Sequence, residues 1–291
     1  MVKKYGDLYL ETRRALLTQE DPASAGLMAR NLIALCAGQT QEHILANLEM
    51  YAGEETCKKV DHAVKRLLKG EPLAYVLGEW EFYGLPLHVN ENVLIPRDDT
   101  VAVASLAIKQ AIFLPAAPRI LDLCTGSGCI GLAVASRIKD ARVTLADISK
   151  DALAVAKKNI TRNKMSGRVS AIHVDALAPV PAFLGKFDMI ISNPPYIDSA
   201  DMMDLDDSVK LYEPHLALFG GEDGLDFYRS IAENFTPALK PGGFLCLEFG
   251  DDQGNDVCRI LEENGYTILE RSRDYNDRER AVLAQYGRKE D

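Results

Sequence analysis

Residues 119–131 have the sequence RILDLCTGSGCIG, in which an apolar run passes into a glycine-rich turn. The run Arg119–Cys124 has the composition of a short strand buried in a parallel sheet. Gly126, Gly128 and Gly131 then satisfy the G-x-G-x-x-G spacing, and an apolar helix follows. Glycine permits positive φ and a close approach of the backbone to a ligand, and the first turn of a helix offers free N–H groups. The stretch therefore predicts the first strand–turn–helix unit of a nucleoside-binding α/β fold.

Two acidic residues follow the next two predicted strands. Asp147 closes the strand Val143–Ala146, at about the distance where an acidic residue takes ribose hydroxyls in nucleoside-binding folds. Asp175 ends a third strand, Val169–Val174, from which it can reach an adenine amino group while Ala176 packs beside the ring. The pattern fits a dinucleotide such as NAD as well as S-adenosylmethionine, and it also fits a plain glycine-rich turn with a capping aspartate.

A carboxylate within the first strand favours S-adenosylmethionine over a dinucleotide. Asp122 comes just before the glycine loop, where it can order the loop or meet the cationic methionine part of that cofactor. A pyrophosphate would be repelled by the same charge. We therefore expect a sulfonium cofactor at this edge of the sheet.

The tetrapeptide Asn193-Pro194-Pro195-Tyr196 follows the apolar run Phe187–Ser192, so it should lie at the carboxyl end of a buried strand, where α/β sheets bind ligands. Proline has no N–H and a fixed φ, so the two prolines make a stiff turn that presents carbonyls. The Asn193 side-chain oxygen and the Pro194 carbonyl are candidate acceptors for the two hydrogens of a planar NH2 group, with the Tyr196 ring stacked on it. A hydride-transfer enzyme has no use for such a pocket. The alternative interpretation is a Pro-Pro turn that merely ends a strand.

Six segments, in order along the chain, together match one family pattern: EPLAY at 71–75, NVLIPR at 92–97, DLCTGSGCI at 122–130, NPPYI at 193–197, YEP at 212–214 with AL at 217–218, and GGEDGL at 220–225. This ordered set resembles the peptide chain release factor glutamine N5-methyltransferases, the HemK/PrmC-like proteins. Single motifs of the set recur in DNA and ribosomal RNA methyltransferases, but the ordered set is far more specific.

The resemblance implies a doubly wound class I S-adenosylmethionine-dependent methyltransferase sheet, with the last strand antiparallel and a small N-terminal helical bundle. It implies a bundle for substrate recognition at 1–73, a β-hairpin linker at 74–97 and a methyltransferase domain at 98–291. The implied activity is methylation of the side-chain amide nitrogen of the glutamine in the Gly-Gly-Gln motif of class I release factors, which modulates translation termination. The cofactor would be S-adenosylmethionine and the product S-adenosylhomocysteine.

The resemblance also implies the site residues. Asn193, Pro194 and Tyr196 would be catalytic, and Asn193 to Tyr196, Pro195 included, would hold the glutamine amide. No metal site is expected. The implied cofactor contacts are Asp122, Cys124, Thr125, Gly126, Ser127, Gly128, Asp147, Asp175, Ala176 and Asn193.

Two positions depart from the family pattern. Cys124 stands where a glycine is usual, which implies a slightly different loop path. Asp98-Asp99-Thr100-Val101 replaces a Pro-x-Thr-Glu type run, so we assign no role to a glutamate there. Glu248 and Arg97 are interpreted as structural braces, and on resemblance alone Gly220–Tyr228 is expected to clamp the substrate.

The charge distribution bears on the substrate. The chain carries 33 basic and 43 acidic residues, for a net charge of −10, whereas nucleic-acid enzymes usually carry basic surfaces. Beside one lysine, Lys210, the loop after the tetrapeptide carries six acidic residues: Asp198, Asp201, Asp204, Asp206, Asp207 and Glu213. Such a loop would repel a nucleic-acid backbone and attract a basic, ribosomal-RNA-binding protein such as a release factor. The alternative is a solvated acidic loop that only aids solubility.

The composition bears on metal sites, disulfides and cellular location, and two other functions remain open. The six cysteines form no C-x-x-C pair, so disulfides and zinc are not expected, and the absence of a signal-type or membrane-spanning stretch indicates a cytosolic protein with no membrane partner. One rival function is an exocyclic-amine methyltransferase acting on adenine N6 or guanine N2 of DNA or rRNA. The other is a nicotinamide-dependent oxidoreductase or a non-catalytic binding module.

The chain outside these motifs predicts three regions. Asp21-Pro22 begins a helix that Gly38 ends, and a second helix covers Glu55–Lys69, within an N-terminal bundle of four or so helices that extends to about Gly70. Alternating apolar residues around Tyr83-Gly84 predict a hairpin. At the C-terminal end we expect a strand at 243–248 after a Lys240-Pro241-Gly242 turn, a helix at 253–264, and strands at 267–273 and 279–285 that pair antiparallel.

Overall fold

The structure is a computed structural model that describes residues 2–287. Met1 and residues 288–291, with which the predicted domain ranges 1–73 and 98–291 begin and end, lie outside the described residues. The chain divides into two compact units. The first runs to Gly78 and includes Asp207–Tyr212, and the second contains Glu79–Asp206 and the chain from Glu213 onward.

The first unit is a small helical bundle, as the sequence predicts. Asp21 accepts hydrogen bonds from Ala23 and Ser24 at the start of its second helix, and Gly38 ends that helix in the left-handed conformation. Its buried core is aliphatic and includes Leu32 and Val60. The elements of this unit are β1 (Lys3–Lys4), α1 (Tyr5–Leu16), α2 (Pro22–Ala37), α3 (Gln41–Ala46), β2 (Tyr51–Ala52), α4 (Glu54–Leu67), α5 (Leu73–Leu77) and α10 (Asp207–Tyr212).

A two-stranded hairpin begins the second unit, as the alternating pattern predicts. Strands β3 (Glu79–Phe82) and β4 (Leu85–His88) pair antiparallel. Tyr83 and Gly84 both have positive φ, which is the backbone that a two-residue primed turn requires. Phe82 and Leu87 are buried, so the hairpin contributes one face to the core.

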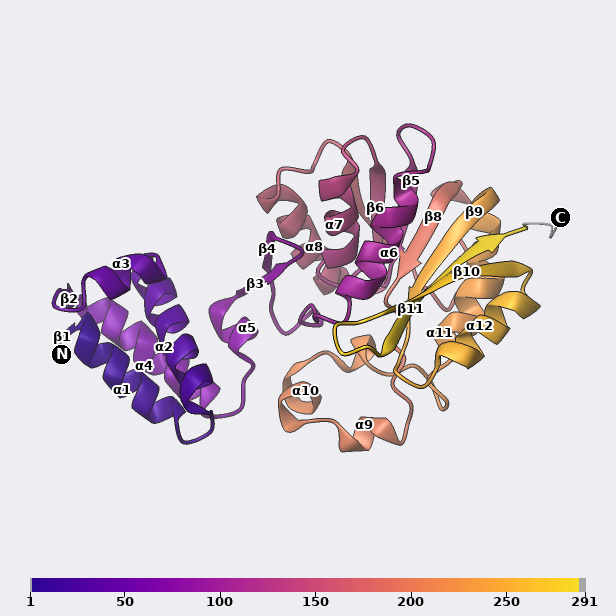
Figure 1. Ribbon diagram of the computed structural model, residues 1–291. Coiled ribbons are helices and arrows are strands. Elements are labelled where there is room, and N and C mark those ends of the chain that lie inside the picture. The colour runs from indigo at the N-terminus through magenta and orange to yellow at the C-terminus, as the bar shows by residue number, and fades with distance from the viewer. Residues whose placement is uncertain (1, 288–291) are drawn as a thin grey trace. The chain divides into compact units, whose positions relative to one another are not determined.

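A seven-stranded sheet forms the centre of the second unit (Figure 1). Its spatial order is β10-β11-β9-β8-β5-β6-β7, in which the pairs from β9 to β7 are parallel and β11 runs antiparallel to both of its neighbours. The predicted doubly wound sheet with an antiparallel last strand is therefore confirmed. The strands are β5 (Arg119–Leu123), β6 (Arg142–Asp147), β7 (Val169–His173), β8 (Phe187–Ser192), β9 (Leu239–Glu248), β10 (Tyr266–Arg273) and β11 (Glu279–Tyr286).

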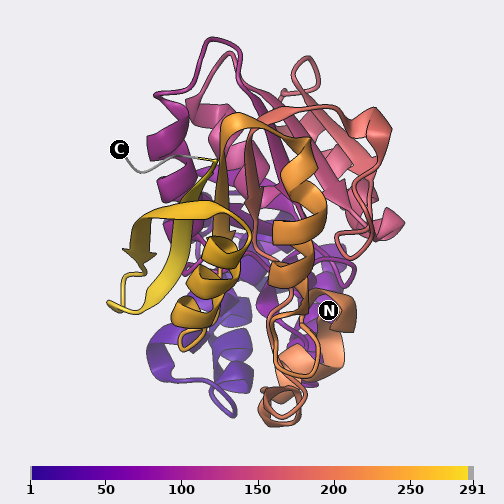
Figure 2. The ribbon, with the colours of Figure 1, turned by 90° about the vertical axis from the view of Figure 1, so that its right-hand side faces the viewer.

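Helices cover both faces of this sheet. Alternate residues of each strand point to opposite sides, so Ile120 and Ile191 pack in one core cluster while Leu121 and Ile190 pack in the other. The first cluster lies under α6 (Val101–Ala111), α7 (Cys129–Arg137) and α8 (Lys150–Arg162). The second lies under α11 (Asp226–Ser230) and α12 (Gly254–Glu263), which stand in front of the strands in Figure 2.

The start of β9 corrects one sequence prediction. Lys240-Pro241-Gly242 is not a turn that precedes the strand, because β9 already begins at Leu239. Leu239 pairs with Phe187, the register then shifts, and Met189 pairs with Phe244. The Pro-Gly pair is thus absorbed as an irregularity within the strand, where Gly242 takes positive φ.

Short elements complete the second unit. They include α9 (Asp201–Asp204), the one-turn helices η1 (Ala182–Leu184), η2 (His215–Ala217) and η4 (Thr236–Ala238), and the π-helical turn η3 (Ile231–Phe235) that continues α11. Within residues 2–287, no helix has both the length and the apolar composition that a bilayer crossing needs.

Candidate active site

A pocket opens at the carboxyl edge of the parallel strands in the second unit. Its walls come from the loops after β5, β6, β7 and β8, together with the segments 92–100 and 214–217. The predicted residues in the wall are Cys124, Thr125, Gly126, Ser127, Asp147, Asp175, Ala176, Asn193 and Pro195. Asp122, Gly128, Pro194 and Tyr196 lie outside the wall, so four of the predicted site residues would act from behind it or beside it.

The glycine loop is held by two carboxylates. Asp147 Oδ2 accepts a hydrogen bond from Gly126 N at 2.8 Å, and its Oδ1 accepts one from Ser149 N at 2.9 Å. A carboxylate oxygen has two lone pairs, so each oxygen retains one for a ligand hydroxyl. Burial raises the pKa of Asp147, and the backbone hydrogen bonds from Ser149 and Gly126 oppose that shift.

Asp122 orders the loop rather than lining the pocket. Its Oδ2 accepts hydrogen bonds from Thr125 Oγ1 at 2.5 Å and from Gly131 N at 2.9 Å. The side chain is buried, and Oδ1 has no hydrogen-bond partner within residues 2–287. Burial raises the pKa of Asp122 to about 7. The sequence suggested that Asp122 either orders the glycine loop or meets the cationic part of the cofactor. The contacts in the structure are those of loop ordering.

Cys124 has a backbone conformation that glycine adopts more readily than other residues. Its φ is 57°, in the left-handed region where glycine is favoured, and the side chain lines the pocket. A non-glycine residue is strained there by about 1 kcal/mol or more. Burial also raises the pKa of the Cys124 thiol far above its ordinary value, so the group is neutral at pH 7.

The opposite side of the wall carries Asp175 and Ala176. Asp175 Oδ1 accepts a hydrogen bond from Leu177 N at 2.8 Å, which turns the chain just after β7. Ala176 is buried, and its carbonyl accepts a hydrogen bond from Ser230 Oγ at 2.7 Å. Both residues border apolar side chains, Leu177 and Phe227, which suit the face of a purine.

Asn193 is oriented by a buried polar chain. Its Nδ2 donates to Thr100 Oγ1 at 3.3 Å, and Thr100 Oγ1 donates to Glu248 Oε1 at 3.3 Å. Thr100 and Glu248 are 2% and 1% exposed. Because the NH2 group of the Asn193 side chain donates to Thr100, the side-chain oxygen of Asn193 remains for an acceptor role.

Glu248 supports this orientation from the end of β9. Burial raises its pKa to about 8, and the hydrogen bond from Thr100 and the charge of Arg280 oppose that shift. Its Oε2 is buried without a hydrogen-bond partner in the described part of the chain. The sequence suggested a structural role for Glu248. In the structure Glu248 accepts a hydrogen bond from Thr100, which in turn holds Asn193.

The rest of the tetrapeptide is anchored from behind. Pro194 is buried, and within residues 2–287 no hydrogen bond is made to its carbonyl. Tyr196 is half-buried, and burial, followed by the charge of Glu248, raises its pKa to about 12. The Tyr196 carbonyl accepts a hydrogen bond from Gln253 Nε2 at 2.9 Å.

An ion pair between Arg97 and the buried Glu213 links two segments of the pocket wall, 92–100 and 214–217. Glu213, whose side chain is 1% exposed, accepts hydrogen bonds from Arg97 Nη2 and, at 3.1 Å, from Ile95 N. Glu213 is one of the six acidic residues expected to repel a nucleic acid or attract a basic protein, but its burial and its pairing with Arg97 remove it from that exposed set. Asp201 and Asp204 of the same loop are exposed.

Sequence reasoning gave no role to Thr100 or Gln253. Thr100 lies in the run that departs from the family pattern, and its hydroxyl three residues after Arg97 of the Ile-Pro-Arg motif was the available signal. Gln253 is a polar residue at the first turn of α12 and resembles any helix cap. Thr100 and Gln253 both hydrogen-bond the tetrapeptide from residues far away in the sequence. The periodicity of apolar residues gives no information on such contacts.

The pocket wall is chemically selective. Among the described residues that line it there is no lysine, arginine or histidine, whereas Asp147 and Asp175 are both present. A pyrophosphate would find no cation here, whereas a sulfonium and an ammonium group would find carboxylates. The residues therefore fit S-adenosylmethionine better than a dinucleotide.

Comparisons with known proteins agree with this chemistry. Residues 9–78 match the family model described as the PrmC N-terminal domain, and residues 99–207 match the methyltransferase small domain. The release factor glutamine methyltransferase of Clostridium acetobutylicum is 40% identical over 244 residues, which cover 84% of this chain and 85% of that protein. The protein of the same name from Geobacter sulfurreducens is 35% identical over 280 residues, which cover 96% and 95%.

Solved structures agree on the fold. A methyltransferase from Pyrococcus furiosus superposes with a TM-score of 0.52 at 20% identity, over 78% of this chain and 100% of that chain. At this identity, the likeness extends to the architecture alone.

Proposed function

The chain belongs to the release factor glutamine methyltransferase family, and from that membership we propose that it methylates the Gly-Gly-Gln glutamine of class I release factors. The methyl group would pass from S-adenosylmethionine to the side-chain amide nitrogen, with S-adenosylhomocysteine as the product. Because release factors act in translation, we place this activity in the cytoplasm. We assign recognition of the release factor to the helical bundle, residues 1–73, and methyl transfer to residues 98–291, joined by the 74–97 hairpin segment.

One observation carries this proposal. Asn193 lines the pocket with its NH2 end held by Thr100, which leaves its side-chain oxygen for an acceptor role. We propose the Pro194 carbonyl, which makes no hydrogen bond within residues 2–287, as the second acceptor. Two acceptors match the two hydrogens of a carboxamide. Drawing those hydrogens out of plane frees the nitrogen lone pair, which in a resting amide is delocalised into the carbonyl.

The chain's residues supply position rather than a strong base. S-adenosylmethionine supplies an electrophilic methyl carbon when it is bound. Asp147, Asp175 and the loop Thr125–Gly128 would hold it, while Asn193 and Pro194 would aim the amide nitrogen in line with the bond that breaks. The nitrogen loses its extra proton after transfer, and placement of this kind is worth several kcal/mol.

The rival substrate is an exocyclic amine of adenine or guanine in a nucleic acid, since it too presents a planar NH2 group. The exposed carboxylates Asp201, Asp204, Asp206 and Asp207 oppose that choice, because phosphates would be repelled there. The same charges favour a basic protein. We therefore propose a protein partner rather than a nucleic acid, and we propose no membrane partner.

The test is methylation in vitro. A release factor incubated with the enzyme and methyl donor should gain one methyl group on the Gly-Gly-Gln glutamine, read by peptide mass spectrometry. A Gln→Ala acceptor is the matched control and should gain none. Methylation of DNA or rRNA instead of the protein would overturn the proposal.

A further inference from the structure

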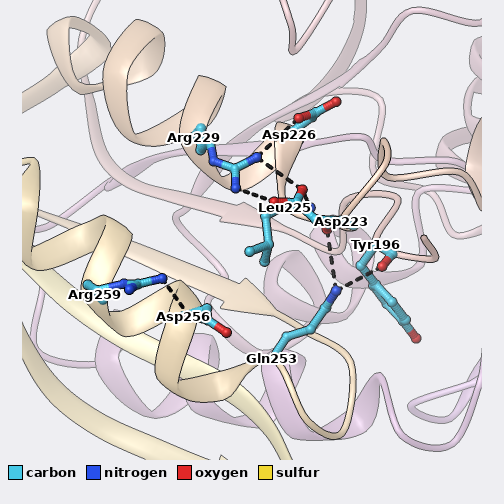
Figure 3. Close-up of polar contacts among 9 residues, drawn as sticks. Tyr196, Asp223, Leu225, Asp226, Arg229, Gln253, Asp256 and Arg259 are labelled. Carbon is cyan, nitrogen blue, oxygen red and sulfur yellow. Dashed lines mark hydrogen bonds and ion pairs between the residues drawn. The ribbon is translucent and has the colours of Figure 1, made fainter. Parts of the chain in front are cut away.

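Gln253 joins three segments around the end of the tetrapeptide. Figure 3 shows its contact with Tyr196. Its Nε2 donates to Tyr196 O at 2.9 Å and to Gly224 O at 3.4 Å. Its Oε1 accepts a hydrogen bond from Gly250 N at 3.0 Å. One side-chain amide thus uses both its donor and its acceptor ends on the backbone of three different loops.

The tetrapeptide depends on such outside contacts. β8 ends at Ser192, and residues 193–196 belong to no helix or strand. Beyond the turn, Ile197 N donates to Leu218 O at 3.0 Å and Gly220 N donates to Ile197 O at 2.8 Å. The direction of the turn is therefore set by this isolated bridge and by the Gln253 amide.

The glycine segment after the bridge lies directly on Tyr196. A Cβ atom at Gly224 would come within 2.3 Å of Tyr196 O, and one at Gly220 within 2.7 Å of Tyr196 Cα. Gly224 also has a φ of 71°. The segment expected to clamp the substrate thus contacts the tetrapeptide itself, and only glycine allows that approach.

The far side of the segment is held by charge. Arg229 pairs with Asp223 and, at 3.2 Å, with Asp226, while Leu225 N donates to Asp223 Oδ1 at 3.1 Å (Figure 3). These contacts fix the loop from outside, but none of them reaches the tetrapeptide. Among the side chains of the described residues, Gln253 is the one that hydrogen-bonds the backbone of Tyr196.

We propose that Gln253 is a positioning residue of the methyl transfer, which holds the Tyr196 carbonyl and thereby fixes the direction of the Asn193–Pro194 acceptors. The inference rests on the proposed function. Gln253 is absent from the pocket wall, so it acts through the turn and not on substrate or cofactor. Because a misplacement of about 1 Å can cost roughly 100-fold in rate, loss of the tether should lower kcat and leave binding nearly unchanged.

The deciding variant is Gln253→Glu. A glutamate keeps an acceptor for Gly250 N, but its ionised form has no donor for the Tyr196 carbonyl. We expect kcat to fall about 10- to 100-fold at pH 8, with KM for the release factor and Kd for S-adenosylmethionine within about threefold. Protonation restores an O–H donor, so the ratio of variant to wild-type kcat should rise as the pH falls toward 6.

The matched control is Gln285→Glu. Gln285 Nε2 donates to Gly242 O at 2.9 Å, which is an equivalent amide-to-backbone contact on β11. It should lower the melting temperature by a similar amount without a change in kcat or in the pH profile. Equal kcat losses in both variants, or a Gln253→Glu ratio that does not change with pH, would overturn the proposal.

Hydrogen exchange tests the Gln253 contact independently of the methyl-transfer activity. If wild-type enzyme does not methylate a release factor, hydrogen exchange of the Ile197 and Gly220 amides still reports on the turn. Exchange at both should accelerate in Gln253→Glu and not in Gln285→Glu. Unchanged exchange would refute the tether itself, whatever the substrate proves to be.

Discussion

The Asn193 amide donates to the Thr100 hydroxyl across 93 residues of sequence, at 3.3 Å. That contact fixes which end of the amide faces the pocket, and Thr100→Val removes it while keeping the shape of the side chain. We expect kcat to fall about tenfold, since the amide can then rotate, while S-adenosylmethionine binding is retained. Thr100→Ser keeps the hydroxyl and should remain near wild type, so equal losses in the two variants would contradict this role.

Asn193→Ala should abolish transfer, because it deletes one of the two proposed acceptors. Cofactor binding, measured by titration calorimetry, should stay within about threefold of wild type. Asn264→Ala is the control, since Asn264 only caps α12 through Ile260 O. Normal turnover by the Asn193 variant would remove the central assignment.

Arg97→Ala should destabilise the protein by about 2 kcal/mol, because it leaves the buried Glu213 carboxylate without its ion-pair partner. The figure stays below that for a fully buried pair since Arg97 itself is 41% exposed. Arg259→Ala breaks the exposed pair with Asp256 and should cost no more than about 0.5 kcal/mol. Urea unfolding of both variants provides the comparison, and equal costs would show that Glu213 is solvated.

Cys124→Gly should stabilise the fold by about 0.5 kcal/mol. It relieves left-handed strain of roughly 1 kcal/mol or more, and the greater freedom of glycine in the unfolded chain offsets part of that gain. The same change at Cys258, within α12, should instead cost about 1 kcal/mol. Thermal unfolding separates the two, and destabilisation at both positions would mean that the Cys124 side chain contributes more than its strain costs.

Glu248→Gln should alter how stability depends on pH. The folded-state pKa of about 8 lies above the ordinary value of 4.5, so between these values the folded protein binds more protons than the unfolded chain. The stability linked to Glu248 is therefore complete below about pH 4.5 and is lost as the pH rises toward 8.

The neutral glutamine lacks this titration. The stability difference, variant minus wild type, should grow from pH 5 to 8 and level off above 8 in urea unfolding series. A difference that does not change with pH would mean that the carboxyl group is ionised throughout.

The sequence predicted local structure well where one segment carries its own signal. The runs at 119–124 and 187–192 form adjacent parallel strands, and the hairpin at 267–285 closes the sheet antiparallel, because apolar periodicity and turn residues specify each of these. The predicted turn at Lys240-Pro241-Gly242 was wrong, because these residues form an irregularity within β9 where its pairing with β8 shifts. The local sequence alone does not distinguish such an irregularity from a turn.

Contacts that orient the site were harder to predict. Glu213 and Arg97 are 116 residues apart, and Gln253 and Tyr196 are 57 apart. The sequence around Glu213 does not distinguish a buried ion-pair partner from a solvated charge. The sequence around Gln253 does not distinguish a contact with Tyr196 from an ordinary helix cap. Such pairings depend on the assembled sheet, which brings the loop ends to one edge.

The place of β11 in the sheet affects how the protein can be made. Strand β11 lies between β9 and β10, and within residues 2–287 it is the one strand that pairs with β10. The edges of β9 and β10 that face β11 therefore stay open until residues 279–286 have left the ribosome. Unpaired strand edges invite association with other chains. A chain truncated before Glu279 should therefore be a good chaperone client, and the full 291-residue chain a poor one.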